Sequence, residues 1–123
     1  QAVRFQRVHS VQELEQAVQA AQGKRVMLDF YADWCVSCKE YEQFVFTNPE
    51  VRTELNQIVL LQADVTANNA QDAALLKKFE LFGPPGIVFF NTQGQALQPV
   101  IKGYHDADRF LKILRALKGQ PHA

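Results

Sequence analysis

Apolar residues recur along this chain with two spacings, one typical of helices and one typical of buried strands. After Ser10, an i, i+3, i+4 apolar stripe predicts a helix that ends at Gly23. Ser10 and Glu13 are spaced as a capping box at the start of that helix. The run 26–31 is apolar on both faces apart from Asp29, which is typical of a strand in the centre of a sheet.

Similar signals predict the remaining elements. We expect further strands at residues 3–8, 58–65, 87–90 and 97–102, further helices at 35–46, 49–56, 69–79 and 106–118, and a frayed tail at 120–123. A hairpin turn is expected at 91–94, and Pro99 favours an edge position for the strand that follows. The order β-α-β-α-α-β-α-β-β-α predicts an α/β fold, with a central mixed β-sheet flanked by helices on both faces.

Length and composition limit the class of protein. The 123 residues, of which 47% are hydrophobic, are enough for a single domain over residues 1–123 with its own core. The formal net charge is +0, which gives no electrostatic reason to bind nucleic acid. No apolar run approaches the roughly 20 residues of a membrane helix. Because the chain starts at Gln1 without a Met or a signal peptide, we expect a domain excised from a longer protein.

The chain has two cysteines, Cys35 and Cys38, at the junction of the strand 26–31 and the helix that follows. Unpaired N–H groups and a partial positive charge at a helix N-terminus stabilise a thiolate, so Cys35 is the expected nucleophile and the more exposed of the two. Cys38 lies one turn later, within reach of Cys35 for an intramolecular disulfide. This pattern predicts a dithiol–disulfide oxidoreductase.

Two other interpretations of the cysteine pair fit the sequence less well. Two core cysteines at an accidental spacing would not explain why strand, Trp34, cysteine pair and helix occur together. A closed zinc site needs about four ligands, of which this pair supplies half. The histidines are scattered, at His9, His105 and His122. We therefore expect no metal and no cofactor other than the redox-active disulfide.

Two acidic residues are candidates for proton transfer at the cysteine pair. Asp29 interrupts an apolar strand, where a charge is costly unless it has a function. Glu42 follows Cys38 by four residues, so an α-helix would place it between the two sulfurs, on the buried side. Both could raise the thiol pKa values and accept the proton of Cys38. The alternatives are a solvated strand end for Asp29 and an ordinary surface glutamate for Glu42.

Together these residues resemble the thioredoxin family, over nearly the whole chain. The matching positions are Asp29, Trp34, Cys35, Cys38, Gly83, Pro85 and Gly103. The resemblance implies that Asp29 assists proton transfer, Cys35 attacks and Cys38 resolves. It also implies a cis peptide bond at Pro85, facing the disulfide. The groove that receives a partner would be lined by Trp34, Pro84, Pro85 and Gly103.

Segments 26–42 and 61–69 are similar to the C-terminal periplasmic domain of the DsbD family of membrane reductases. That resemblance implies electron transfer from a transmembrane domain to an N-terminal periplasmic domain of the same protein, and onward to disulfide isomerases and cytochrome c maturation. It also implies a periplasmic location, and acids beside the dithiol at the positions of Asp29 and Glu42. We expect no nucleic acid partner and a monomeric isolated domain.

The chain departs from the general thioredoxin pattern in two places. Val36 and Ser37 replace the usual Gly-Pro between the cysteines, which disfavours an ordinary thioredoxin. Pro84 has no N–H to offer a docked partner, so we expect one hydrogen bond fewer and a shorter-lived complex. Two acids near the dithiol favour a reductant, although a cysteine pair alone does not set the direction of electron flow. A stand-alone thioredoxin served by thioredoxin reductase and a non-catalytic interaction module remain the alternatives.

Overall fold

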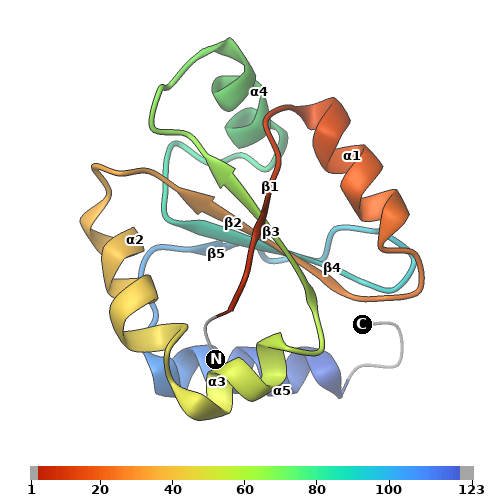
Figure 1. Cartoon of the computed structure of the whole chain (residues 1–123), viewed down its shortest axis with the longest axis vertical. Helices are drawn as coiled ribbons and strands as arrows, with labels where there is room; N and C mark the ends of the chain where they lie inside the picture. The colour runs from red at the N-terminus through yellow and green to blue at the C-terminus, as the bar shows by residue number, and fades with distance from the viewer. Residues whose placement is uncertain (1–2, 120–123) are drawn as a thin grey trace.

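A computed structural model describes residues 3–119, which form a twisted mixed sheet with helices on both faces (Figure 1). In chain order the elements are β1 (Gln6–Arg7), α1 (Val11–Ala20), β2 (Val26–Tyr31), α2 (Val36–Glu40), the π-helical turn η1 (Tyr41–Val45), α3 (Pro49–Leu55), β3 (Val59–Asp64), α4 (Ala70–Lys78), β4 (Gly86–Phe90), β5 (Ile101–Lys102) and α5 (Ala107–Lys118). The predicted fold class is confirmed. The tail expected at residues 120–123 lies outside the described residues.

The sheet has the strand order β1-β3-β2-β4-β5. Strands β1, β3 and β2 are parallel, whereas β4 is antiparallel to both β2 and β5. All six residues of β2 are buried, as expected of a central strand. Phe30 near the end of β2 pairs with Gly86 at the start of β4. The segment after β2 and the segment before β4 therefore meet at one end of the sheet.

Each face of the sheet has its own hydrophobic core. Helices α1 and α4 cover one face, and η1, α3 and α5 cover the other (Figure 1). On the second face Phe110 is fully buried, and its ring centroid lies 5.9 Å from that of Tyr41 and 6.0 Å from that of Phe46. This aromatic packing fixes the helical segment after Cys38 against the sheet.

Predicted helix and turn signals are largely confirmed. Ser10 Oγ accepts a hydrogen bond from the Glu13 N–H at 3.0 Å and caps α1. The expected capping box is only half formed, because the Glu13 carboxylate accepts from the His9 N–H at 2.8 Å instead. The turn at 91–94 is present, with a 3.0 Å hydrogen bond from the Gly94 N–H to the Asn91 carbonyl and a φ of 81° at Gly94.

Three strands are shorter than predicted, and β3 loses only one residue at each end, covering Val59–Asp64 rather than 58–65. The first covers Gln6–Arg7 rather than residues 3–8. The last covers Ile101–Lys102 rather than 97–102, because Pro99 has no N–H with which to continue the ladder. The expected edge position of β5 is confirmed.

The helix expected at residues 35–46 is not a continuous α-helix. α2 ends at Glu40, and η1 follows with a 2.8 Å hydrogen bond from the Phe46 N–H to the Tyr41 carbonyl. This π-helical turn changes the angular spacing of side chains beyond Glu40, so positions counted along an ideal α-helix no longer apply there.

Candidate redox site

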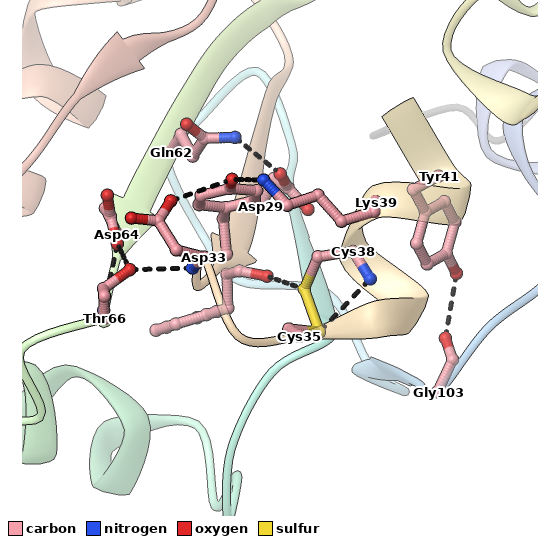
Figure 2. Close-up of a disulfide and its surroundings, with 12 residues drawn as sticks. Asp29, Asp33, Cys35, Cys38, Lys39, Tyr41, Gln62, Asp64, Thr66 and Gly103 are labelled. Carbon is pink, nitrogen blue, oxygen red and sulfur yellow. Dashed lines mark hydrogen bonds between the residues drawn. A yellow bond between two sulfur atoms is a disulfide. The ribbon is translucent and has the colours of Figure 1, made fainter. Parts of the chain in front are cut away.

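Cys35 and Cys38 are joined by a disulfide at the start of α2, with a Cα–Cα distance of 5.2 Å (Figure 2). Cys35 is the N-cap of this helix, and its Sγ accepts a hydrogen bond from the Cys38 N–H at 3.2 Å. A thiolate at this position would keep that donor, since an N-cap side chain faces the unpaired N–H groups of the first turn. The local backbone therefore favours charge on Cys35.

Both sulfur-bearing residues are nearly buried. Cys35 is 6% exposed and Cys38 is 4% exposed, so the expected difference in accessibility is small in this oxidised form. Cys38 Sγ lies 3.7 Å from the Phe30 carbonyl oxygen, to which an S–H group can donate once the disulfide is reduced. Cys38 is thus placed over the end of β2.

Asp29 is buried in the centre of the sheet, with 4% of its surface exposed. Burial raises the pKa of its carboxyl to about 7, and the negative charge of Glu42 adds to this rise. A hydrogen bond from Gln62 Nε2 to Asp29 Oδ2, 2.9 Å long, and the charge of Arg7 act in the opposite direction. A carboxyl that titrates near neutral pH can both accept and return a proton.

Glu42 is exposed, which contradicts the expectation that it faces the buried side of the dithiol. The prediction extended α-helical spacing from Cys38, but Glu42 belongs to the π-helical turn η1. Its charge still acts on Asp29 and raises the pKa of that carboxyl. Glu42 therefore acts on Asp29 through its charge, from an exposed position and not from the buried side of the disulfide.

The loop that leads into α2 is tied to the loop after β3. The Asp33 N–H donates to Thr66 Oγ1 at 2.8 Å, and Trp34 Nε1 donates to the Thr66 carbonyl at 3.2 Å. The Tyr31 hydroxyl donates to Asp33 Oδ1 at 3.0 Å and accepts from the Lys39 ammonium. The indole ring of Trp34 stays 59% exposed beside the disulfide.

The Pro84–Pro85 peptide bond is cis, as the resemblance implies. Pro85 immediately precedes Gly86, which pairs with Phe30 beneath Cys38. The Pro85 carbonyl accepts from the Gly103 N–H at 3.4 Å, and Gly103 has a φ of 75° that favours glycine. The structure thus brings Pro85 and Gly103 to the end of the sheet that carries the cysteines.

Sequence reasoning missed Tyr41, which links this loop to the helical segment that carries Cys38. Its hydroxyl donates to the Gly103 carbonyl at 2.9 Å (Figure 2). The same hydroxyl accepts from the His105 N–H at 3.1 Å. Burial raises the pKa of the Tyr41 phenol to about 12, and the nearby charge of Asp29 contributes. Gln62 was missed too, although a polar residue within a buried strand is the same signal that identified Asp29.

Exposed apolar side chains lie close in sequence to the cysteines and to the cis bond. Trp34 and Val36, which is 74% exposed, flank Cys35, and the fully exposed Phe82 precedes the segment of Gly83 and the two prolines. A hollow of about 790 Å³ lies elsewhere, between α1 and the turn after β4 at the other end of β2. Exposed apolar side chains therefore stand on both sequence sides of Cys35, and another precedes the cis-proline segment.

In the part of the chain that the structure describes, no group of three or more His, Cys, Asp and Glu side chains could hold a metal ion. Between residues 3 and 119, no helix is both long enough and apolar enough to cross a bilayer.

Sequence comparison relates this chain to thioredoxin-like domains and to DsbD proteins. Residues 12–118 match the thioredoxin-like domain family. The chain is 54% identical over 121 residues to the thiol:disulfide interchange protein DsbD of Ralstonia nicotianae, which covers 97% of this chain and 20% of that protein. It is 52% identical over 112 residues to DsbD of Escherichia coli K12, covering 90% of this chain and 20% of that protein. The chain thus spans about a fifth of the length of these relatives.

Solved structures agree with this relationship. The oxidised C-terminal domain of DsbD from Neisseria meningitidis superposes with a TM-score of 0.71 at 37% identity, covering 84% of this chain and 88% of that one. Spinach chloroplast thioredoxin f, at 20% identity and a TM-score of 0.72, shares the fold and covers 94% of this chain and 95% of that one. The chain belongs to the thioredoxin-like domain family and, within it, is related to the C-terminal domains of DsbD proteins.

Proposed function

We propose that this chain is a thiol–disulfide oxidoreductase that relays electrons from a transmembrane domain to a partner domain in the periplasm. The observation that carries the proposal is the Cys35–Cys38 disulfide at the N-terminus of α2, close to the buried acid Asp29. The relatives named as thiol:disulfide interchange proteins support the same reaction class.

The reaction proceeds in two exchanges. The Cys35 thiolate attacks one sulfur of the partner disulfide, forms a mixed disulfide and releases the first partner thiolate. Cys38 then loses its proton to Asp29, and the Cys38 thiolate attacks Cys35 Sγ and releases the second partner thiolate. Two electrons pass to the partner, and the Cys35–Cys38 disulfide forms.

We infer that the domain acts as a reductant. Once Asp29 is ionised, its buried negative charge, with Glu42 near it, disfavours a second negative charge on the sulfurs and so favours the protonated thiols. A strong oxidant depends on the opposite effect, a stabilised thiolate in the reduced form. The N-cap position of Cys35 acts in the opposite direction, on Cys35 alone.

We infer that the partners are other parts of a longer DsbD-like protein. The chain spans about a fifth of its DsbD relatives, so the remaining four fifths of such a protein can supply a membrane domain and a second periplasmic domain. On this proposal, the single thioredoxin-like domain at residues 1–123 is a periplasmic domain of an inner-membrane protein, with no cofactor beyond its disulfide.

The partner docks on the open surface around the dithiol. The exposed indole of Trp34, the Pro84–Pro85 segment and Gly103 form the contact area in this proposal. Because Pro84 lacks an N–H, a docked extended segment forms one backbone hydrogen bond fewer there. Weak docking suits a relay, which has to release each partner after transfer.

A trapping experiment tests the proposal. Reduced Cys38→Ala protein, mixed with the oxidised N-terminal domain of the relatives, should accumulate a mixed disulfide through Cys35, seen by non-reducing electrophoresis and mass spectrometry. The Cys35→Ala, Cys38→Ala double variant is the matched control and should give no adduct. Absence of the adduct from folded Cys38→Ala protein would refute the relay. Rapid NADPH consumption by the wild-type domain with thioredoxin reductase would favour a stand-alone thioredoxin instead.

A further inference from the structure

Three polar side chains lie in one row across the parallel half of the sheet. Arg7 on β1 is in register with Gln62 on β3, and Gln62 is in register with Asp29 on β2. Arg7 Nε donates to Gln62 Oε1 at 2.7 Å, and Gln62 Nε2 donates to Asp29 Oδ2 at 2.9 Å. A continuous hydrogen-bonded chain thus connects the edge strand to the buried acid, and Figure 2 shows its inner end, with the Gln62 amide directed at Asp29.

The outer end of this row is held in place by a second contact. Arg7 Nη1 lies 3.0 Å from Asp64 Oδ2, at the end of β3, and the guanidinium lies 5.9 Å from the centre of the Tyr31 ring. The Arg7 side chain is about half exposed, so its head group is fixed by these contacts rather than by burial. The planar guanidinium of Arg7 therefore binds two neighbouring side chains of β3, Gln62 through Nε and Asp64 through Nη1.

The chemistry of the guanidinium fixes the orientation of the Gln62 amide. Arginine has donors only, so the Gln62 atom that faces Arg7 has to be the carbonyl oxygen. The NH₂ group then has to face Asp29. Without Arg7 the amide could rotate by half a turn and offer its carbonyl oxygen to Asp29, which suits a protonated carboxyl rather than a carboxylate.

We propose that Arg7 is a positioning residue, which holds the Gln62 amide with its NH₂ group toward Asp29 and thereby favours the carboxylate that accepts the Cys38 proton. The structural part of this inference stands by itself, and its kinetic part rests on the proposed function. Arg7 lies on the far side of Gln62 from Asp29, so it acts through another side chain and does not touch the reacting atoms.

Other groups also act on Asp29 and have to be separated from this effect. Glu42 and Tyr41 lie on η1, and the charge of Glu42 opposes ionisation of Asp29. Arg7 contributes directly through its charge as well as through Gln62. On β4, the residue in register with Asp29 is the apolar Ile87. The test therefore has to distinguish orientation of the amide from simple attraction between Arg7 and Asp29.

A double-mutant cycle makes this distinction. The Asp29 carboxyl is titrated by carbon-13 NMR in the oxidised wild-type chain and in the Arg7→Met, Gln62→Met and doubly substituted variants. Arg7→Met should move the Asp29 midpoint to higher pH. In the Gln62→Met background the same substitution should move it by less than half as much, because no amide remains to be positioned. Arg4→Met, which removes the same charge from the same exposed segment, should leave the midpoint unchanged.

Kinetics provide the second measurement. Below the Asp29 midpoint, Arg7→Met should slow resolution of a mixed disulfide by about two- to threefold, with a smaller effect above it. Arg7→Lys, which keeps a donor-only group, should recover most of the wild-type pH profile. Circular dichroism verifies that each variant is folded.

An equal midpoint shift in both backgrounds would overturn the proposal, because Arg7 would then act by charge alone. No shift on Arg7→Met would overturn it too. If the midpoint behaves as expected while Cys38→Ala traps no partner, the positioning role stands and the proposed relay fails, so the two failures are distinguishable.

Discussion

The hydroxyl of Tyr41 lies 2.9 Å from the Gly103 carbonyl oxygen, so one buried side chain joins the segment after Cys38 to the loop before α5. The same hydroxyl accepts from the His105 N–H, and the Gly103 N–H in turn reaches the Pro85 carbonyl. The cis-proline segment and the helical segment behind the dithiol are thus connected through a single phenol. Loss of the Tyr41 hydroxyl should therefore affect both the cis-proline segment and the helical segment after Cys38.

The first prediction concerns that phenol. Tyr41→Phe leaves the Gly103 carbonyl and the His105 N–H without their partner, and should lower the free energy of unfolding by about 1–2 kcal/mol. It should also slow reduction of a partner disulfide, because the loop that holds Pro85 becomes less ordered. Urea unfolding and stopped-flow exchange measure the two effects.

Tyr104→Phe is the matched control for Tyr41→Phe. The Tyr104 ring packs 5.1 Å from the Tyr41 ring, and within residues 3–119 its hydroxyl makes no intramolecular hydrogen bond. It should change stability by less than about 0.5 kcal/mol. Equal losses in the two variants would mean that removal of a phenol hydroxyl in this cluster, rather than loss of the bonds to Gly103 and His105, explains the effect.

The second prediction concerns the pH dependence of stability. Asp29 has a pKa of about 7 in the folded chain against an ordinary value of 3.8, so between these pH values the folded state holds a proton that the unfolded state has lost. Stability should therefore fall as pH rises from 4 to 7, by up to about 4 kcal/mol from this group. Asp29→Asn keeps an acceptor for Gln62 but cannot ionise, and should remove this dependence.

Urea unfolding of wild type and Asp29→Asn at pH 4.5, 6 and 8 is the measurement. The free energy of unfolding of Asp29→Asn, relative to that of wild type, should rise with pH and be highest at pH 8. The same variant should resolve mixed disulfides more slowly above pH 7, since the proton acceptor is lost. Parallel stability curves for the two proteins across this range would contradict the raised pKa of Asp29.

The sequence was sufficient for the fold because its signals are local. The apolar run of β2, the cap at Ser10 and the turn at Asn91 each depend on neighbouring residues, and all are present in the structure. The π-helical turn was not predicted, because Tyr41 and Phe46 pack against Phe110 of the distant helix α5 on the same face of the sheet. Without that packing, residues 35–46 give an ordinary helix signal.

The sequence identified the site residues that are chemically unusual among their neighbours. It did not identify the contacts that form between separate strands of the sheet. Cys35, Cys38 and Asp29 stand out as unusual residues in their local sequence. Arg7 does not, because its role follows from the parallel register of β1, β3 and β2. Gln62 carries the local signal of a polar residue in a buried strand, but that register decides which side chains it contacts. Glu42 shows the converse, since its buried position was inferred from a helical spacing that ends two residues earlier.

The third prediction concerns Glu42. Its negative charge raises the pKa of Asp29, so Glu42→Gln should lower that pKa and speed resolution at pH 6. Because Glu42 is exposed, the gain should be at most about twofold and should shrink at high salt. Glu40→Gln is the control, since the charge of Glu40 acts on Tyr104. Equal effects of the two substitutions, measured by stopped flow, would show that only net charge matters.

The last prediction concerns Phe82, whose exposure of 106% means that its ring makes little contact with the fold. Phe82→Ser should leave the free energy of unfolding within about 0.5 kcal/mol of wild type. If the apolar surface beside the cis-proline segment receives the partner, the same change should raise KM for the partner disulfide by about three- to tenfold with little change in kcat. Phe44→Ser, which removes a 61% exposed ring from η1, is the matched control and should leave KM unchanged. A KM for Phe82→Ser equal to that of the control would exclude Phe82 from the docking surface, and a fall in kcat alone would assign it to the chemical step instead.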